Sequence, residues 1–182
     1  MSQRAEAGKA SIGIIGTGSY LPERVLTNAD IEKMVDTTDE WIRTRTGILE
    51  RHIAPEGEGT SDLAMRAAQK ALQAAGVAPE ALDLIVMGSF TADTYLPSGA
   101  CLVQNKIGAK NAFCFDLVAA CSGFLYSLEV AKSLMLVNGY QTALVIGAEK
   151  LSPFTDWEDR RTCVLFGDGA GAAVLRATDG SN

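Results

Sequence analysis

Apolar residues recur along the chain with two different spacings, and these predict strands and helices in alternation. Short, nearly continuous apolar runs predict buried strands at 11–20, 82–90, 113–118 and 142–147. Helical spacing, with glycine directly after the last apolar position, predicts helices at 39–46, 61–75, 97–107 and 124–138, and a capping signal predicts another at 29–35. Runs at 163–166 and 170–175, separated by Gly167-Asp168-Gly169, predict a hairpin.

This order of elements predicts an α/β fold with a mostly parallel, five-stranded sheet flanked by helices. We divide the chain into a polar leader at 1–10, expected to be disordered, one domain at 11–176 and a linker-like end at 177–182. The glycine pair Gly16-x-Gly18 is expected to form a tight turn at the end of the first strand. It is not a dinucleotide-binding loop, because the third glycine is missing and Leu21-Pro22 follows where a helix should begin.

Composition narrows the class of protein. The chain has 182 residues, 47% of them apolar, which is enough for one packed core. No apolar run appears long enough to span a bilayer and no secretory signal core is present, so we expect a cytoplasmic protein without a membrane partner. The net charge of −6 argues against nucleic-acid binding. The four cysteines lie far apart without metal-ligand spacing, so we expect no metal site.

The strongest chemical candidate is Cys121, which lies where a strand gives way to a helix. A thiol in the first turn of a helix is close to free backbone N–H groups, which favour the thiolate and can also hold an oxyanion. Small neighbours, Ala119, Ala120, Ser122 and Gly123, leave room for a substrate carbonyl. On the residues alone, a buried structural cysteine remains the commoner alternative.

A second candidate is the pair Trp41 and Arg45, four residues apart on one face of the predicted helix 39–46. An aromatic ring beside a guanidinium suits an adenine and its phosphates. An exposed tryptophan covered by an arginine stem has the same pattern, and the residues leave both interpretations open.

Three blocks of sequence, in this order, resemble the β-ketoacyl-acyl carrier protein synthase III family of thiolase-fold condensing enzymes. They are 36–48 with 50–53, the nucleophile motif at 116–124, and Leu165-Phe166-Gly167-Asp168-Gly169-Ala170-Gly171-Ala172. The resemblance runs from about Ile12 to about Leu175. It implies the N-terminal half of a thiolase-like fold, because the family's proteins continue for about as many residues again. Such a half is expected to expose apolar surface.

The resemblance implies an acyltransferase of fatty-acid synthesis. Cys121 would take an acyl group from a short acyl-coenzyme A and condense it with malonyl-acyl carrier protein, with loss of carbon dioxide. Acyl-coenzyme A is then a substrate, and no cofactor is expected. The family's catalytic His and Asn lie outside this chain, and we interpret His52 as structural.

The resemblance also assigns binding residues. Those expected to hold coenzyme A are Thr37, Trp41, Arg45 and Arg160, with Arg160 on the opposite side of the adenine from Trp41. Those expected to line the acyl pocket are Leu96, Leu151 and Phe166, and Leu96 matches a position that reaches the neighbour's pocket in the family's dimer.

The sequence also predicts a partner, and two alternative functions remain open. An apolar edge strand at 112–118 is an aggregation risk unless it is paired, so we predict a homodimer. A different thiolase-fold acyl-coenzyme A condensing enzyme is one alternative, for example a hydroxymethylglutaryl-coenzyme A synthase or a long-chain head-to-head enzyme. A non-catalytic half that serves as a subunit is the other.

Overall fold

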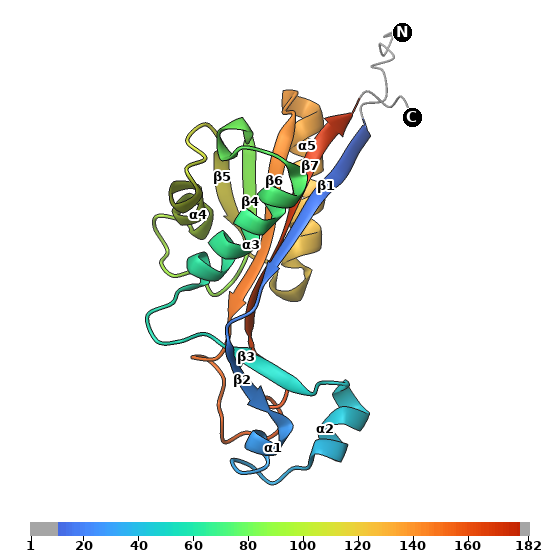
Figure 1. Cartoon of the computed structure of the whole chain (residues 1–182), viewed down its shortest axis with the longest axis vertical. Helices are drawn as coiled ribbons and strands as arrows, with labels where there is room; N and C mark the ends of the chain where they lie inside the picture. The colour runs from blue at the N-terminus through green and yellow to red at the C-terminus, as the bar shows by residue number, and fades with distance from the viewer. Residues whose placement is uncertain (1–10, 179–182) are drawn as a thin grey trace.

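A five-stranded sheet forms the centre of the computed structural model, which describes residues 11–178 (Figure 1). Its strands, in spatial order, are β1 (Ser11–Tyr20), β7 (Asp168–Thr178), β6 (Thr142–Lys150), β4 (Leu84–Gly88) and β5 (Phe113–Leu117). β4 pairs in parallel with β5 and β6, whereas β7 is antiparallel to β6 and β1. Only β7 therefore runs against the others, and the expected mostly parallel α/β sheet is confirmed.

Helices cover both faces of the sheet (Figure 1). α3 (Thr60–Ala75) and α4 (Gly99–Ile107) lie on one face, with Ile85 and Met87 of β4 in the same core cluster. α5 (Gly123–Asn138) lies on the other, where Leu84 and Val86 join Ala131 and Met135. Successive side chains of a strand point to opposite faces, so a strand covered on both sides needs apolar residues at every position. This explains the unbroken apolar run in β4.

The glycines of β1 have a different role from the one expected. The strand continues through Tyr20 without a turn, and Gly16 and Gly18 lie inside it against α3. A Cβ at Gly18 would lie 2.4 Å from the Ala67 carbonyl oxygen and 2.4 Å from the Ala71 nitrogen. The helix backbone therefore approaches the strand closely, and the alanine-rich face of α3 is the other half of this contact.

We predict that Gly18→Ala destabilises the fold by about 1–3 kcal/mol, because the added methyl group meets the backbone of α3 rather than a flexible side chain. Gly13→Ala is the matched control in the same strand, since nothing lies within 4 Å of its Cβ position. Urea unfolding of the two variants measures the difference. Equal losses of stability would show that α3 is not seated on β1 as described.

A smaller unit lies at one end of the sheet (Figure 1). Its strands β2 (Arg24–Thr27) and β3 (Glu50–Ile53) pair antiparallel, and its helices are α1 (Asn28–Ile31) and α2 (Asp39–Thr46). The helix predicted at 29–35 ends early, at Ile31, and Glu32 instead accepts a hydrogen bond from the backbone nitrogen of Asp39 at 2.5 Å. α2 agrees with the prediction, with Thr38 as its cap and Gly47 at φ 74° as its stop.

The predicted hairpin at 163–175 is wrong in its first strand. Residues 163–165 form a turn, Phe166 has no regular structure, and Cys163 and Val164 are buried in the core of the small unit with Ile31 and Ile42. Their apolar character comes from this burial and not from a strand. β7 begins only at Asp168, whose carboxylate accepts hydrogen bonds from the backbone nitrogens of Ala54 and Ser152.

The predicted boundaries are tested only in part. β7 continues to Thr178, which pairs with Ser11, so the first two residues of the expected linker belong to the sheet. The predicted leader, 1–10, and residues 179–182 lie outside the described residues. A short 3₁₀ turn at Pro79–Ala81 completes the elements between α3 and β4.

The outer face of α5 carries exposed apolar side chains, as expected for half of a larger fold. Leu125, Tyr126 and Val137 are 66%, 57% and 83% exposed. By length and composition alone, the helical stretch Ala120–Asn138 is apolar enough to cross a bilayer, which corrects the expectation that no such run exists. The stretch is apolar because one face of α5 packs against the sheet and the outer face also carries apolar side chains, which are exposed.

Candidate active site

Cys121 lies on an elbow between β5 and α5. The strand ends at Leu117, a 3₁₀ turn spans Ala120–Ser122, and α5 begins at Gly123. Ala120 has φ 45°, a left-handed conformation that costs energy for a residue with a Cβ. The Cys121 side chain is exposed. The alternative of a buried structural cysteine is therefore wrong for this chain.

Backbone contact between α5 and the end of β4 sets the position of the elbow. A Cβ on Gly88 would lie 2.7 Å from the carbonyl carbon of Gly123, so β4 has no room for a side chain where the backbone of α5 crosses it. Gly147, at the same level of β6, faces the Phe124 ring, with 3.2 Å from its Cβ position to the Phe124 Cβ. The first turn of α5 is thus seated on two adjacent strands.

Asp116 ties the strand before the elbow to the neighbouring helix. Its two carboxylate oxygens accept hydrogen bonds from the backbone nitrogens of Gly99 and Ala100, each at 2.7 Å. The Leu117 carbonyl accepts a further bond from the Ser89 nitrogen at 3.2 Å. The end of β5 is therefore held by the start of α4 and by the residue that follows β4. These contacts limit the movement of the elbow that follows.

The N-terminus of α5 has no side-chain cap, because Ser122 makes no capping hydrogen bond. The first N–H groups of a helix lack partners within the helix and carry its positive dipole end. Here the Ser122 and Gly123 nitrogens already donate to the carbonyls of Ala119 and Ala120, and the exposed Cys121 thiol lies in this turn, at the positive dipole end of the helix. This arrangement suits a cysteine nucleophile and the oxyanion that forms when such a thiolate attacks a carbonyl.

Sequence reasoning missed Glu149, at the end of β6. Its carboxylate accepts hydrogen bonds from the Phe90 nitrogen at 3.0 Å and from the hydroxyl of Thr91, and burial raises its pKa above the ordinary value. Glu149 therefore holds the start of the loop that leads to Leu96. An acidic residue directly after a buried strand is the only signal in the sequence that points to it.

The structure brings together three of the four residues expected to hold coenzyme A. The guanidinium carbons of Arg45 and Arg160 lie 4.5 Å and 4.9 Å from the centroid of the Trp41 ring. The hydroxyl oxygen of Thr37 is buried and has no hydrogen-bond partner among the described residues. An adenine between Trp41 and Arg160 needs about 7 Å between them, so Arg160 must move for the expected arrangement to form.

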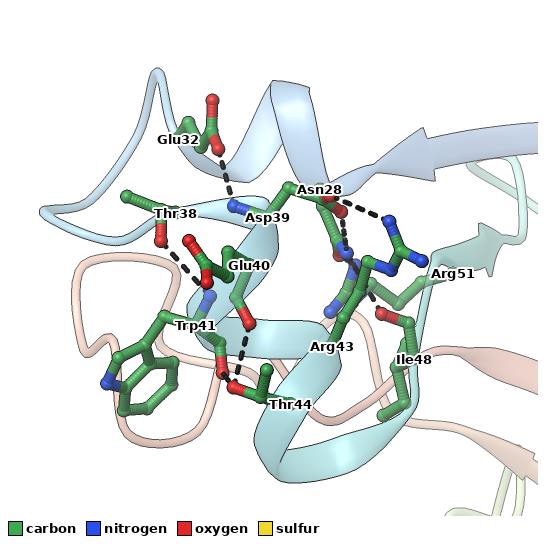
Figure 2. Close-up of polar contacts among 10 residues, drawn as sticks. All are labelled: Asn28, Glu32, Thr38, Asp39, Glu40, Trp41, Arg43, Thr44, Ile48 and Arg51. Carbon is green, nitrogen blue, oxygen red and sulfur yellow. Dashed lines mark hydrogen bonds and ion pairs between the residues drawn. The ribbon is translucent and has the colours of Figure 1, made fainter.

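A buried arginine connects this group to the rest of the small unit. Arg51 is 3% exposed, and its guanidinium donates to the Val164 carbonyl at 3.1 Å and 2.5 Å and to the Asn28 side chain at 2.5 Å. Asn28 in turn donates to Asp39 at 2.7 Å and to the Ile48 carbonyl at 2.9 Å (Figure 2). Burial lowers the pKa of Arg51, an effect that nearby Cys163 partly opposes.

This network joins α2, which carries Trp41 and Arg45, to the segment that carries Arg160. Nδ1 of His52, next to Arg51, donates a hydrogen bond to the Pro22 carbonyl at 2.5 Å, a contact that fits the structural role expected of His52.

We predict that Arg51→Met lowers the free energy of unfolding by about 2–4 kcal/mol, because the Val164 carbonyl and the Asn28 amide oxygen lose their buried donor. Arg43→Met is the control on the same unit. Arg43 makes an exposed ion pair with Asp39 at 3.3 Å, worth less than about 1 kcal/mol. Thermal unfolding, followed by tryptophan fluorescence, compares the two variants. A loss of stability in Arg51→Met no larger than that in Arg43→Met would contradict the role given to the Arg51 network.

The residues expected to line an acyl pocket do not enclose one within the described chain. Leu96 is 86% exposed, Phe166 is 37% exposed and Leu151 is half-buried. A surface hollow of about 420 Å³ lies nearby, between the β2–β3 pair and the segment after β6, lined in part by Met34, Lys150 and Trp157. None of the three predicted pocket residues lines it, so their assignment stays a prediction.

The layered α/β fold, with an exposed cysteine on an elbow between the edge strand and its helix, is that of a thiolase-like protein. The family model for 3-oxoacyl-[acyl-carrier-protein] synthase III matches residues 115–182. A β-ketoacyl-[acyl-carrier-protein] synthase III of Clostridium acetobutylicum is 55% identical over 169 residues, which are 93% of this chain and 52% of that protein. One of Xylella fastidiosa is 59% identical over 166 residues, 91% of this chain and 51% of that protein.

Solved structures agree with these matches. The crystal structure of 3-oxoacyl-[acyl-carrier-protein] synthase III from Aquifex aeolicus VF5 superposes with a TM-score of 0.89 at 55% identity, and the match covers 92% of this chain and 54% of that one. OleA of Xanthomonas campestris has a TM-score of 0.78 at 21% identity, a likeness of fold alone. Within the thiolase-like class, the chain is thus a homologue of the β-ketoacyl-[acyl-carrier-protein] synthase III proteins, and it spans about half the length of the relatives that it matches.

Proposed function

We propose that this chain is the acyl-accepting half of a β-ketoacyl-acyl carrier protein synthase III, an acyltransferase that starts fatty-acid synthesis. The observation that carries the proposal is the exposed Cys121 thiol beside the uncapped N-terminus of α5. The printed names of its relatives support the reaction class.

In the proposed first step, the Cys121 thiolate attacks the carbonyl carbon of a short acyl-coenzyme A. The thioester bond to coenzyme A breaks, coenzyme A leaves as its thiol, and the acyl group remains on Cys121 as a new thioester. The positive dipole end of α5 supports this step, since the tetrahedral intermediate carries negative charge on the former carbonyl oxygen.

In the proposed second step, malonyl-acyl carrier protein loses carbon dioxide, and its enolate carbon attacks the acyl thioester of Cys121. The products are a β-ketoacyl-acyl carrier protein and the free thiol. The enolate needs polar donors in a dry pocket, which we assign to a His and an Asn outside this chain. Cys121 is thus the nucleophile of both steps in this proposal, and the decarboxylation depends on the remaining part of the enzyme.

For coenzyme A itself we propose the group around Trp41. The ring offers a stacking surface for adenine once Arg160 moves to the opposite side of the adenine, and the guanidinium group of Arg45 offers charge for phosphates. The buried hydroxyl of Thr37 has no partner among the described residues, and a further polar contact to it requires that the side chain become accessible. Leu96, Leu151 and Phe166 are proposed to border the acyl chain once a second subunit and the missing half of the enzyme cover them.

Assembly and location belong to the same proposal. β5 is an edge strand of the sheet, and its exposed Phe113 favours pairing with a second copy into a homodimer. The outer face of α5 is proposed to pack against the remaining half of the fold rather than a membrane. We place the enzyme in the cytoplasm, with acyl-coenzyme A and malonyl-acyl carrier protein as partners, and the acidic composition argues against nucleic acid as a partner.

Incubation with acetyl-coenzyme A tests the proposal through the intact mass of the chain. We expect one acetyl group per chain, lost on treatment with neutral hydroxylamine because it is a thioester, and absent from Cys121→Ser. Trp41→Ala is expected to lower the rate of labelling at low acetyl-coenzyme A about tenfold and to leave the final extent unchanged, since one lost stacking contact costs about 1–2 kcal/mol.

Circular dichroism shows whether each sample is folded. A folded wild-type chain that takes no acetyl group, or a Cys121→Ser chain that takes one, would contradict the assignment of Cys121. The first result would favour the non-catalytic half subunit. Labelling by a different acyl-coenzyme A alone would favour another thiolase-fold condensing enzyme.

A further inference from the structure

Two cysteines that the proposed function does not use lie in contact between β5 and α4. Cys101 is in the first turn of α4 and Cys114 is the second residue of β5. Their sulfur atoms are 3.4 Å apart, and both side chains are half-buried. The Asp116 bonds to Gly99 and Ala100 hold the start of α4 against this part of β5.

We propose that Cys101 and Cys114 are a reversible oxidation site, which forms a disulfide between α4 and β5 when the chain meets a peroxide. A disulfide has an S–S length of about 2.05 Å, so the two sulfur atoms must approach by about 1.4 Å. Rotation of two side chains that are not tightly enclosed is enough for a change of this size. The site is independent of the acyl transfer proposed for Cys121.

The groups around the two sulfur atoms indicate which thiol reacts with the oxidant first and which then forms the disulfide. The Ser98 hydroxyl donates a hydrogen bond to the Cys101 sulfur at 3.3 Å, and the start of α4 adds its positive dipole end. The Cys114 thiol donates to the side-chain oxygen of Gln104 at 3.2 Å. Burial and the neighbouring Cys101 thiol raise the pKa of Cys114 to about 12, so Cys114 keeps its proton. Cys101 is therefore the sulfur that meets the oxidant first, and Cys114 is the sulfur that resolves the product.

The chemistry balances with hydrogen peroxide as the oxidant. The Cys101 thiolate attacks one oxygen, the O–O bond breaks, hydroxide leaves, and Cys101 becomes a sulfenic acid. The Cys114 sulfur then attacks the Cys101 sulfur, the S–O bond breaks, and the Cys114 proton leaves with the hydroxyl group as water. The two thiols together lose two electrons and two protons, and the peroxide becomes two molecules of water.

Peptide mapping tests this site. A reduced chain is treated with hydrogen peroxide under native conditions, its free thiols are blocked with iodoacetamide, and it is digested with trypsin. Cys101 falls in the peptide 71–106 and Cys114 in the peptide 111–132, which also holds Cys121. The experiment is therefore done in parallel on Cys121→Ser. We expect the two peptides joined in both proteins and released by dithiothreitol.

The rate of cross-linking is the second readout, because it depends on how close the two sulfur atoms lie. We expect the cross-link to form at least about tenfold faster in the folded chain than in urea, because unfolding removes the contact between the two sulfur atoms. Cys101→Ser and Cys114→Ser are the matched controls, and each should lose the cross-link. In Cys114→Ser, Cys101 should instead accumulate the sulfenic acid and its higher oxides, since the resolving thiol is gone.

Two results would overturn the proposal. One is a folded chain in which both peptides stay separate while Cys101 or Cys114 carries oxygen. The other is a cross-link that joins two molecules, or that involves Cys121 or Cys163 in place of the pair. Neither result bears on acetyl labelling of Cys121, so this site and the proposed function fail or stand separately.

Discussion

The close backbone contact between Gly88 and Gly123 is the constraint on which the rest of the site depends. It lets the first turn of α5 lie directly on the end of β4, where a side chain at Gly88 would force the helix away. The connection from β5 must then turn sharply, and Ala120 takes a left-handed conformation to do so. The packing of α5 on the sheet offsets the strain at Ala120. The sharp turn leaves Cys121 exposed at a helix N-terminus.

Most of the fold could be predicted from the sequence, because the buried strands and helices have strong periodicity and clear stops. β4 and α3 are the best examples, with apolar residues on both faces of one and an alanine face on the other. The failures have physical causes. Cys163 and Val164 are apolar because a loop buries them, which periodicity cannot distinguish from a strand, and Gly18 meets a helix that is distant in sequence.

The candidate site was predictable in its chemistry and less so in its shape. The cysteine elbow follows from local pattern, and the pairing of Trp41 with Arg45 follows from helical spacing. The position of Arg160 over Trp41 brings together segments more than a hundred residues apart, which the Arg51 network also joins, so no local pattern predicts it. The residues expected to line the acyl pocket enclose none within the described chain, and Leu96 lies exposed.

The central claim is that the fold activates Cys121 and does not merely expose it. The most direct measurement is the rate at which iodoacetamide alkylates Cys121 at neutral pH in the folded chain and in the same chain unfolded in urea, read from peptide masses. The elbow predicts faster alkylation in the folded chain, because the exposed Cys121 sulfur lies at the positive dipole end of α5, and slower alkylation of buried Cys163. A folded rate for Cys121 at or below its unfolded rate would contradict the claim.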